Sequence, residues 1–288
     1  MDGFGHWIAN WGVLGMPNIS VVSVVYNEES RIDRFVDNFN WSDDLVIVDK
    51  SSTDRTREIL LDRKVTVITR PYSHTGDEVK FAIEKARHEW VLFVTASDVV
   101  HPNLPRKLEA LIAHPDFPYD GIEIPFAIYV LGIRDVKHSP WDKKSKLLLA
   151  KKGSIHTSNI VHNEVLFSPK QVLSLGYSEN ENLCHLTHPS VDFLLERHMR
   201  YAKLEAKEVS NRRLGMRRAK KGLLRAIFRV LFEKRSFILG DKGIALALAY
   251  MSYSALTYLY IWEKFDGAGS IKYDVIKNDF DMLRSKLT

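Results

Sequence analysis

The N-terminal third of the chain alternates between uncharged, β-branched runs and amphipathic segments. The run ISVVSVVYN at 19–27 is typical of a strand that is covered on both faces. The segment ESRIDRFVDNF at 29–39 has apolar side chains at helical spacing. Further strands are predicted at 44–49, 65–69 and 90–98, and further helices at 51–61 and 76–88. This alternation predicts an α/β fold with a mostly parallel sheet and flanking helices.

The second half of the chain has a looser pattern and then becomes helical. Residues 121–132 read either as a strand pair or as a strand followed by a turn. Two amphipathic helices are predicted at 191–213 and 223–235. Residues 243–262 form a run of 20 residues without charge. We therefore expect an N-terminal arm at 1–17, an α/β domain at 18–189 and a C-terminal helical extension at 190–288.

The composition is that of a globular protein in a reducing compartment. Hydrophobic residues make up 45% and charged residues 27% of the 288 residues, which excludes a largely disordered chain. Cys184 is the only cysteine, so an intrachain disulfide is excluded and a cytoplasmic location is favoured. Residues 1–17 lack the pattern of a secretory signal. They form an ordered arm, a membrane-touching aromatic segment or an expression remnant.

The net charge of +5 is unevenly distributed along the chain. The block from Arg212 to Arg235 contains ten Lys and Arg residues and a single acid, Glu233. Such a block indicates an anionic partner, either lipid headgroups or nucleic acid, or else a solvated helix face. No recognised nucleic-acid motif accompanies it, so we expect no nucleic-acid partner.

The uncharged run at 243–262 is long enough to span a bilayer. Its four tyrosines and its Ser and Thr residues make it less apolar than a typical span. Because a basic block precedes it, we expect this region to lie on an anionic membrane surface, at the inner face of the cell membrane, and not to cross it. The alternative is a buried helix that packs on the α/β domain or mediates homo-oligomer formation.

Two acids end predicted strands, where ligands bind in open parallel sheets. Asp49 follows the second strand, so it is placed either to accept from a nucleobase N–H or ribose hydroxyl, or to cap the next helix. Ser52 or Thr53 is the expected N-cap of that helix. Asp98 follows the fourth strand, so it is placed either to hold a divalent cation on phosphates or to stabilise a turn.

Several fragments together resemble a known family. The segments SVVSVVYNEE, DLVIVDKSSTDRT and AIEKARHEWVLFVTASD occur in the order and spacing of the family 2 glycosyltransferases. The resemblance implies the GT-A fold, a Rossmann-like single domain that binds a nucleoside-diphosphate sugar. IVHNEVLF and the helical C-terminal part are similar to the lipopolysaccharide-core glucosyltransferases. The match extends over roughly residues 18 to 263.

The resemblance implies roles for individual residues of the donor site. Asp49 is implied to contact the uracil or its equivalent. The other positions implied to bind the nucleotide-sugar are Asn27, Glu28, Lys80, Ser97 and Asp98. Lys143, Lys144 and Lys146 are candidate phosphate contacts, or else belong to a solvated loop.

The metal motif of the family is altered in this sequence. Its Asp-x-Asp falls on Thr95-Ala96-Ser97, and Asp98 follows where another acid is common. Both usual aspartates are therefore missing, unless the register shifts by one. Either the diphosphate is neutralised by Lys or Arg without a metal, or a Mg²⁺ or Mn²⁺ ion is held by Asp98 together with His162.

Glu164 in the sequence VHNE falls on the His-Glu position of the family, which implies that it is the catalytic base. Inverting transfer needs a carboxylate to take the proton from the acceptor hydroxyl. For His185 and His188, a structural role is at least as well supported as a site role.

The sequence therefore predicts an inverting glycosyltransferase that moves a sugar, most simply from a UDP-sugar, to a glycan or lipid-linked acceptor. The resemblance implies work in bacterial surface polysaccharide or lipopolysaccharide synthesis. The alternative is a catalytically inactive GT-A scaffold at the membrane, which the altered acid motif permits.

Overall fold

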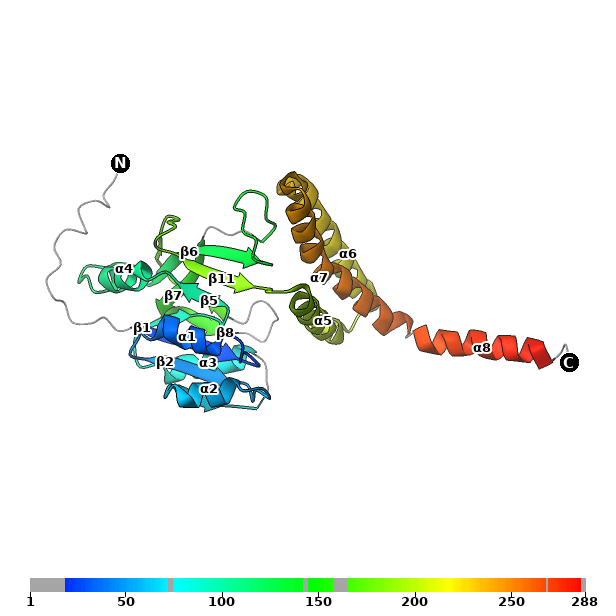
Figure 1. The fold of residues 1–288 in the computed structure, drawn as a ribbon, viewed down its shortest axis with the longest axis horizontal. Coiled ribbons are helices and arrows are strands. Elements are labelled where there is room, and N and C mark those ends of the chain that lie inside the picture. The colour runs from blue at the N-terminus through cyan, green and yellow to red at the C-terminus, as the bar shows by residue number, and fades with distance from the viewer. Residues whose placement is uncertain (1–18, 72–74, 142–144, 158–164, 268, 286–288) are drawn as a thin grey trace. The chain divides into compact units, whose positions relative to one another are not determined.

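The computed structural model describes residues 19–71, 75–141, 145–157, 165–267 and 269–285 (Figure 1). The chain divides into two compact units. Unit 1 consists of Met1–Ile128 and Lys143–Leu186, and unit 2 of Tyr129–Asp142 and Thr187–Thr288. Unit 2 thus contains a segment from the middle of the chain as well as the C-terminal helices.

Unit 1 is built on a sheet in the order β3-β2-β1-β4-β7-β6-β11-β5, with β10 beside β6. The strands are β1 (Ile19–Val25), β2 (Leu45–Asp49), β3 (Thr66–Thr69), β4 (Trp90–Phe93), β5 (Asp98–Val100), β6 (Gly121–Val130), β7 (Ser145–Lys151), β10 (Val172–Ser174) and β11 (Leu183–Thr187). A separate pair is formed by β8 (Ile155–Thr157) and β9 (Val165–Phe167). The helices are α1 (Ile32–Phe39), α2 (Thr56–Asp62), α3 (Thr75–Lys85) and α4 (Asn103–Ile112), and a short 3₁₀ turn η1 (Lys152–Ser154) follows β7.

The parallel part of the sheet is the part that the hydrophobic pattern predicts. β1 pairs in parallel with β2 and with β4, and β2 with β3. Val22, Val48 and Val91 are fully buried in the core that α3 covers. The α/β class with flanking helices and a helical C-terminal part is confirmed. The sheet is mixed, because β7 runs antiparallel to both β4 and β6.

Two local predictions differ from the structure. The predicted strand at 90–98 is broken, because β4 ends at Phe93 and the Asp98 N–H closes a turn onto the Thr95 carbonyl. Asp98 instead begins β5, which pairs with β11. The predicted caps Ser52 and Thr53 are wrong, because α2 begins only at Thr56.

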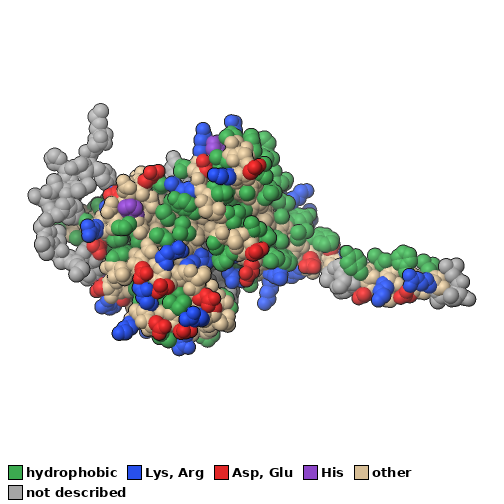
Figure 2. All heavy atoms as spheres, in the orientation of Figure 1, with side chains coloured by type: hydrophobic (Ala, Val, Ile, Leu, Met, Phe, Trp, Pro, Cys, Tyr) green, Lys and Arg blue, Asp and Glu red, His purple; other side chains and the backbone are tan. Residues whose placement is uncertain are grey.

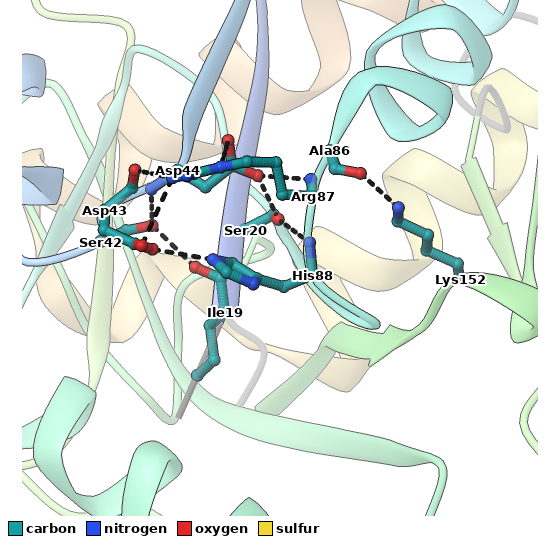
Figure 3. Close-up of polar contacts among 9 residues, drawn as sticks. All are labelled: Ile19, Ser20, Ser42, Asp43, Asp44, Ala86, Arg87, His88 and Lys152. Atoms are coloured by element: carbon teal, nitrogen blue, oxygen red, sulfur yellow. Dashed lines mark hydrogen bonds and ion pairs between the residues drawn. The ribbon is translucent and has the colours of Figure 1, made fainter. Parts of the chain in front are cut away.

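A polar network ties the amino ends of the central strands together (Figure 3). The Ser20 hydroxyl donates to the Asp44 carboxylate at 2.5 Å, and the backbone N–H of Arg87 donates to it at 2.7 Å. The His88 N–H donates to Ser20 Oγ at 3.0 Å. Burial alone would raise the pKa of Asp44, but the hydrogen bonds from Ser20 and Arg87 outweigh it and hold the pKa below its ordinary value. This network lies at the end of the sheet away from the carboxyl edge and therefore serves stability.

Unit 2 is helical in its C-terminal part. Its elements are α5 (Val191–Glu208), α6 (Arg212–Phe228), a π-helical turn η2 (Arg229–Glu233), a 3₁₀ turn η3 (Ser236–Leu239), α7 (Asp241–Asp266) and α8 (Gly269–Ser285). α7 packs against both α5 and α6. Among the described residues, α7 is the one helix whose length and composition would let it cross a membrane, a test that core helices of soluble proteins also pass.

Small residues let the helices of unit 2 approach closely. Gly215, Ala219 and Ala226 form the buried face of α6. At Gly243 of α7, a Cβ would lie 1.7 Å from the carbonyl oxygen of Ser236. Only glycine fits this contact between α7 and η3 without a shift of the backbone.

Candidate functional site

The candidate site lies at the carboxyl edge of the parallel strands in unit 1. β1 ends at Val25, β2 at Asp49 and β4 at Phe93, and parallel register brings these ends to one side of the sheet. The loops that follow these strands contain most of the residues predicted to bind a nucleotide. An edge of this kind is where open α/β sheets bind ligands.

Asn27 links the loop after β1 to the loop after β2. Its backbone has φ of +55°, a left-handed conformation that asparagine tolerates better than most residues. Its N–H donates to Ser52 Oγ at 2.9 Å, and its Oδ1 accepts from the Thr53 N–H at 2.8 Å. The conformation and the hydrogen bonds together fix the positions of both loops.

Asp49 is fully buried at the end of β2. Its carboxylate accepts from the Ser52 hydroxyl at 2.5 Å and from the Ser52 N–H at 3.2 Å. The chain of contacts therefore runs from Asn27 through Ser52 to Asp49. Asp49 does not cap α2, which begins only at Thr56. Ser52 binds Asp49 and Asn27 and does not cap that helix either.

The beginning of α2 is held by other groups. Asp54 accepts from the Thr56 hydroxyl at 2.5 Å and from the Thr56 N–H at 3.0 Å. Burial would raise the pKa of Asp54, but these hydrogen bonds hold it below the ordinary value. Thr56 Oγ1 also accepts from the Glu28 N–H at 2.7 Å, which adds a second link between the two loops.

Arg31 connects the loop after β1 to the turn after β4. Its guanidinium is 8% exposed, forms an ion pair with Glu28 through Nε, and donates from Nη1 to Ser97 Oγ at 2.9 Å. A buried guanidinium in this position holds Glu28 and Ser97 in a fixed relation. The guanidinium thereby lies at the edge where a diphosphate is expected, with its charge balanced by Glu28.

Asp98 is 4% exposed, and both of its carboxylate oxygens are engaged. Oδ2 accepts from the Thr95 N–H at 2.7 Å and from the Thr95 hydroxyl at 3.1 Å. Oδ1 lies 2.7 Å from His185 Nδ1. The carboxylate therefore stabilises its own turn and orients an imidazole from β11.

His185 belongs to a short row of side chains that includes an aromatic ring and a cation. Its imidazole stacks on Phe126 with the ring centroids 5.7 Å apart. Lys146 Nζ lies 5.3 Å from the centroid of the same Phe126 ring. Of the three lysines considered as phosphate contacts, Lys146 thus lies on the Phe126 ring, and Lys143 and Lys144 fall outside the described residues.

The described residues do not fit a conventional divalent-cation site. No group of three or more His, Cys, Asp or Glu that could hold a metal occurs among them. The Asp98 carboxylate already contacts the Thr95 N–H, the Thr95 hydroxyl and His185 Nδ1, so an ion there would share it with these partners. The second expected ligand, His162, falls outside the described residues, as does the expected base, Glu164.

The structure brings together most of the predicted donor-site residues. Hydrogen bonds and an ion pair connect the loops after β1, β2 and β4, which we call the linked loops. Five predicted residues lie in these loops or at their ends: Asn27, Glu28, Asp49, Ser97 and Asp98. Lys80 lies exposed on α3 and is not a member of these contacts. His188 belongs to unit 2, where its ring lies 5.1 Å from that of His198.

The sequence pattern does not identify three residues that contribute contacts to this site. Arg31 lay within a predicted amphipathic helix, where an arginine is read as solvated. Ser52 was assigned to a helix cap, and Phe126 to a core strand. No pattern in the sequence around Glu28 and Arg31, which lie three positions apart, reveals this buried ion pair.

The arrangement offers hydroxyl, amide and carboxylate groups for a base and ribose, and cationic groups for phosphates.

The family model of glycosyl transferase family 2 matches residues 20–162. This range contains the linked loops after β1, β2 and β4. It also contains Glu164's neighbour His162 but ends before Glu164 itself.

Known proteins resemble the chain over most of its length. An uncharacterized glycosyltransferase of Rickettsia conorii is 25% identical over 254 residues, which cover 84% of this chain and 89% of the relative. A second, from Rickettsia felis, is 25% identical over 246 residues, with coverage of 82% and 86%.

Solved structures that were found to be similar to the chain include two complexes with nucleotide-sugars. S. aureus TarS with UDP-GlcNAc is 16% identical, with a TM-score of 0.47 and coverage of 86% of this chain and 91% of that chain. Glucosyl-3-phosphoglycerate synthase of Mycobacterium tuberculosis with Mn²⁺ and UDP-glucose is 17% identical, with a TM-score of 0.36 and coverage of 48% and 57%.

Proposed function

Residues 20–162 belong to glycosyl transferase family 2, which makes the chain a nucleotide-sugar glycosyltransferase, and we propose that it transfers a hexose from a UDP-sugar with inversion. The acceptor is a glycan or a lipid-linked glycan of a bacterial surface polysaccharide or lipopolysaccharide. The observation that carries the proposal is the set of linked loops at the carboxyl edge, which lies within the matched range.

Each linked loop has a separate task in this proposal. Asp49, with Ser52 and Asn27 beside it, contacts the base and ribose. Arg31, which donates to Ser97, and Lys146, which lies on the Phe126 ring, supply cationic groups for the diphosphate leaving group. Cationic groups that stabilise a departing diphosphate lower the barrier to transfer electrostatically.

The proton from the acceptor hydroxyl needs a base, and Glu164 is the proposed one. A glutamate that takes this proton as the hydroxyl attacks the anomeric carbon is general base catalysis. No step of the proposal is routed through a metal ion, since the described donors do not form a cation site.

The test is a thermal-shift screen of the full chain with UDP-glucose, UDP-GlcNAc, GDP-mannose and free UDP, each with and without Mg²⁺ or Mn²⁺. A ligand that binds the native state raises the apparent melting temperature. We expect a UDP-sugar to raise it and to release UDP on addition of acceptor glycans. The absence of any shift and of any UDP release would contradict the proposal.

A second function, a catalytically inactive scaffold, is favoured by one observation, the engagement of both Asp98 oxygens. The same screen separates the two functions. Binding of a UDP-sugar without hydrolysis or transfer to any acceptor indicates the scaffold. Slow UDP release from the bound donor in water is enough to reject it.

A further inference from the structure

The end of α6 and the turns η2 and η3 that follow it carry large hydrophobic side chains on the surface of unit 2. Phe228, Phe232, Phe237 and Ile238 are 54%, 63%, 55% and 55% exposed. The rings of Phe228 and Phe232 lie 5.3 Å apart, and η2 packs against η3. We call these four residues the apolar corner. Contiguous exposed rings of this size mark an interaction surface more often than chance exposure.

A basic groove adjoins the apolar corner. It has a volume of about 860 Å³ and is lined by residues of α6 and η2 and by Tyr250 and Ser254 of α7. Phe228 lines the groove and also belongs to the corner, so the two are continuous. The basic residues that line it are Arg217, Lys220, Lys221, Arg225 and Arg229.

Most of these cations form no ion pair with an acid in the part of the chain that the structure describes. Arg229 pairs with Glu233, the acid that lines the groove, at 3.2 Å. Among the described residues, Arg217, Lys221 and Arg225 form no ion pair, and all three are exposed. They follow one another at a spacing of four along α6, where like charges repel. An anion in the groove would relieve that repulsion.

Polar contacts hold α7 within its bundle. The Tyr253 hydroxyl donates to Glu205 at 2.6 Å, and the Lys264 ammonium donates to the carbonyls at the end of α5. His198 Nδ1 lies 2.8 Å from Ser252 Oγ. Moving α7 alone into a bilayer would break these contacts, so it is expected to remain packed on α5 and α6 at the membrane surface.

We propose that the apolar corner and the basic groove together form a docking surface for an anionic phospholipid bilayer. The groove lies over headgroup phosphates, and the rings of the corner enter the boundary between headgroups and acyl chains. In Figure 2, hydrophobic side chains gather over the region of α6 and α7, with Lys and Arg at the margin. Basic charge beside exposed aromatic and aliphatic side chains matches this surface of a membrane.

A bilayer fits these observations better than the other occupants. A two-fold contact with a second copy would set the basic groove against itself or close to itself. A nucleic acid would match the charge, but it would leave Ile238 and Leu231, 55% and 44% exposed, without an apolar partner. The proposal adds a partner to the proposed function and does not depend on any residue of the donor site.

The experiment is co-sedimentation of the full chain with phosphatidylcholine vesicles and with vesicles containing 30% phosphatidylglycerol. We expect binding only to the anionic vesicles, and weaker binding as salt is raised. The double variant Phe232→Asp with Phe237→Asp should bind at least about tenfold more weakly, since two rings no longer enter the interface. Lys221→Gln and Arg225→Gln should each weaken binding roughly fivefold.

Phe280→Asp on α8 is the matched control, because Phe280 is equally exposed, at 61%, but lies outside the surface. It should leave vesicle binding unchanged. Every variant is first compared with the wild type for melting temperature and for the shift caused by UDP. Retained UDP binding with lost vesicle binding separates this proposal from that of the donor site.

Three outcomes would overturn the proposal. The first is equal binding to neutral and anionic vesicles. The second is unchanged vesicle binding by the Phe232→Asp, Phe237→Asp double variant, or equal loss in Phe280→Asp. The third is a dimer that the wild-type chain forms without vesicles and the double variant does not form, as measured by analytical ultracentrifugation. That result would make the apolar corner a contact between copies of the chain.

Discussion

His185 Nδ1 lies 2.7 Å from Asp98 Oδ1. The contact joins β11 to β5, and the two residues are 87 positions apart in the sequence. A carboxylate that is not protonated can only accept, so the imidazole is the donor in this contact, through Nδ1. The pair thus fixes the orientation of an imidazole that stacks on Phe126, the ring on which Lys146 also lies.

Replacing Asp98 with alanine should lower stability and weaken donor binding. The change leaves the Thr95 N–H and His185 Nδ1 without their acceptor, which costs about 1–3 kcal/mol of unfolding free energy. Urea unfolding and UDP titration measure the two effects. Asp116→Ala, at an exposed position, is the control and should change neither. A variant with unaltered stability would show that the turn does not need the carboxylate.

Replacing Glu164 with glutamine should abolish transfer and leave donor binding intact. The amide cannot take the proton from the acceptor, and loss of a general base reduces the rate by about 10²- to 10⁴-fold. Initial rates of UDP release with acceptor, beside a UDP thermal shift, test both statements. Turnover at the wild-type rate would show that another group is the base.

Asn27 tests whether the linked loops need a left-handed residue. Asn27→Ala loses the contact to Thr53 and strains the backbone, which costs roughly 1–2 kcal/mol for the conformation alone. Asn27→Gly loses the same side chain without that strain. We expect alanine to lower the melting temperature more than glycine, and both to weaken UDP binding. Equal melting temperatures would mean that the loop relaxes.

The Asp44 network predicts how stability depends on pH. Because the folded-state pKa of Asp44 lies below its unfolded value of about 3.9, its contribution is present above that pH. It is lost as pH falls through the folded-state pKa. Asp44→Asn should therefore lower stability at pH 7 by about 1–3 kcal/mol and flatten the acid side of the stability curve.

Asp43 is a matched control for Asp44, because the two are neighbours and Asp43 is 64% exposed. Its ion pairs with Arg87 and His88 lie at the surface, where such pairs contribute about 0–1 kcal/mol. Urea unfolding between pH 7 and pH 3 compares the two variants. A steeper acid dependence in Asp43→Asn than in Asp44→Asn would reverse the assignment.

Two glycines of unit 2 should respond in opposite directions to alanine. At Gly243 the new Cβ would meet the Ser236 carbonyl, so Gly243→Ala should lower the melting temperature. At Gly222, within α6, a Cβ meets no atom within 4 Å. Gly222→Ala should raise stability by roughly 0.5–1 kcal/mol, as expected inside a helix. Circular dichroism at 222 nm during heating measures both changes.

The strands β1, β2 and β4 are predictable from sequence because apolar residues dominate each of them, although the end of β4 at Phe93 is not predicted. The pairing of His185 with Asp98 is not predictable, since it depends on which distant strand lies beside β5. Ser52 shows a second limit. Its position suits a helix cap, but its hydroxyl instead donates to Asp49 and accepts from the Asn27 N–H. These two contacts define the loop.

The donor site is predictable to the extent that strand ends and a family resemblance identify it. Asp49 is identified by its place at the end of a strand, and Asn27 and Ser97 are identified by the family resemblance. Arg31 could not be located, because a helix pattern does not reveal that a guanidinium is buried against Glu28 and Ser97. Burial of a charge is a property of the folded loops and leaves little trace in hydrophobic periodicity.

The segment Tyr129–Asp142 leaves unit 1 and returns to it, so the chain passes between the units after residues 128, 142 and 186. Ser236 Oγ donates to the His138 carbonyl at 2.8 Å, and Arg229 Nε donates to the Pro140 carbonyl at 2.8 Å. A chain truncated at residue 189 would keep this segment and lose its partners. Unit 1 with the Tyr129–Asp142 segment is therefore not a detachable module, and its recombination with a different tail would require two exchanged segments.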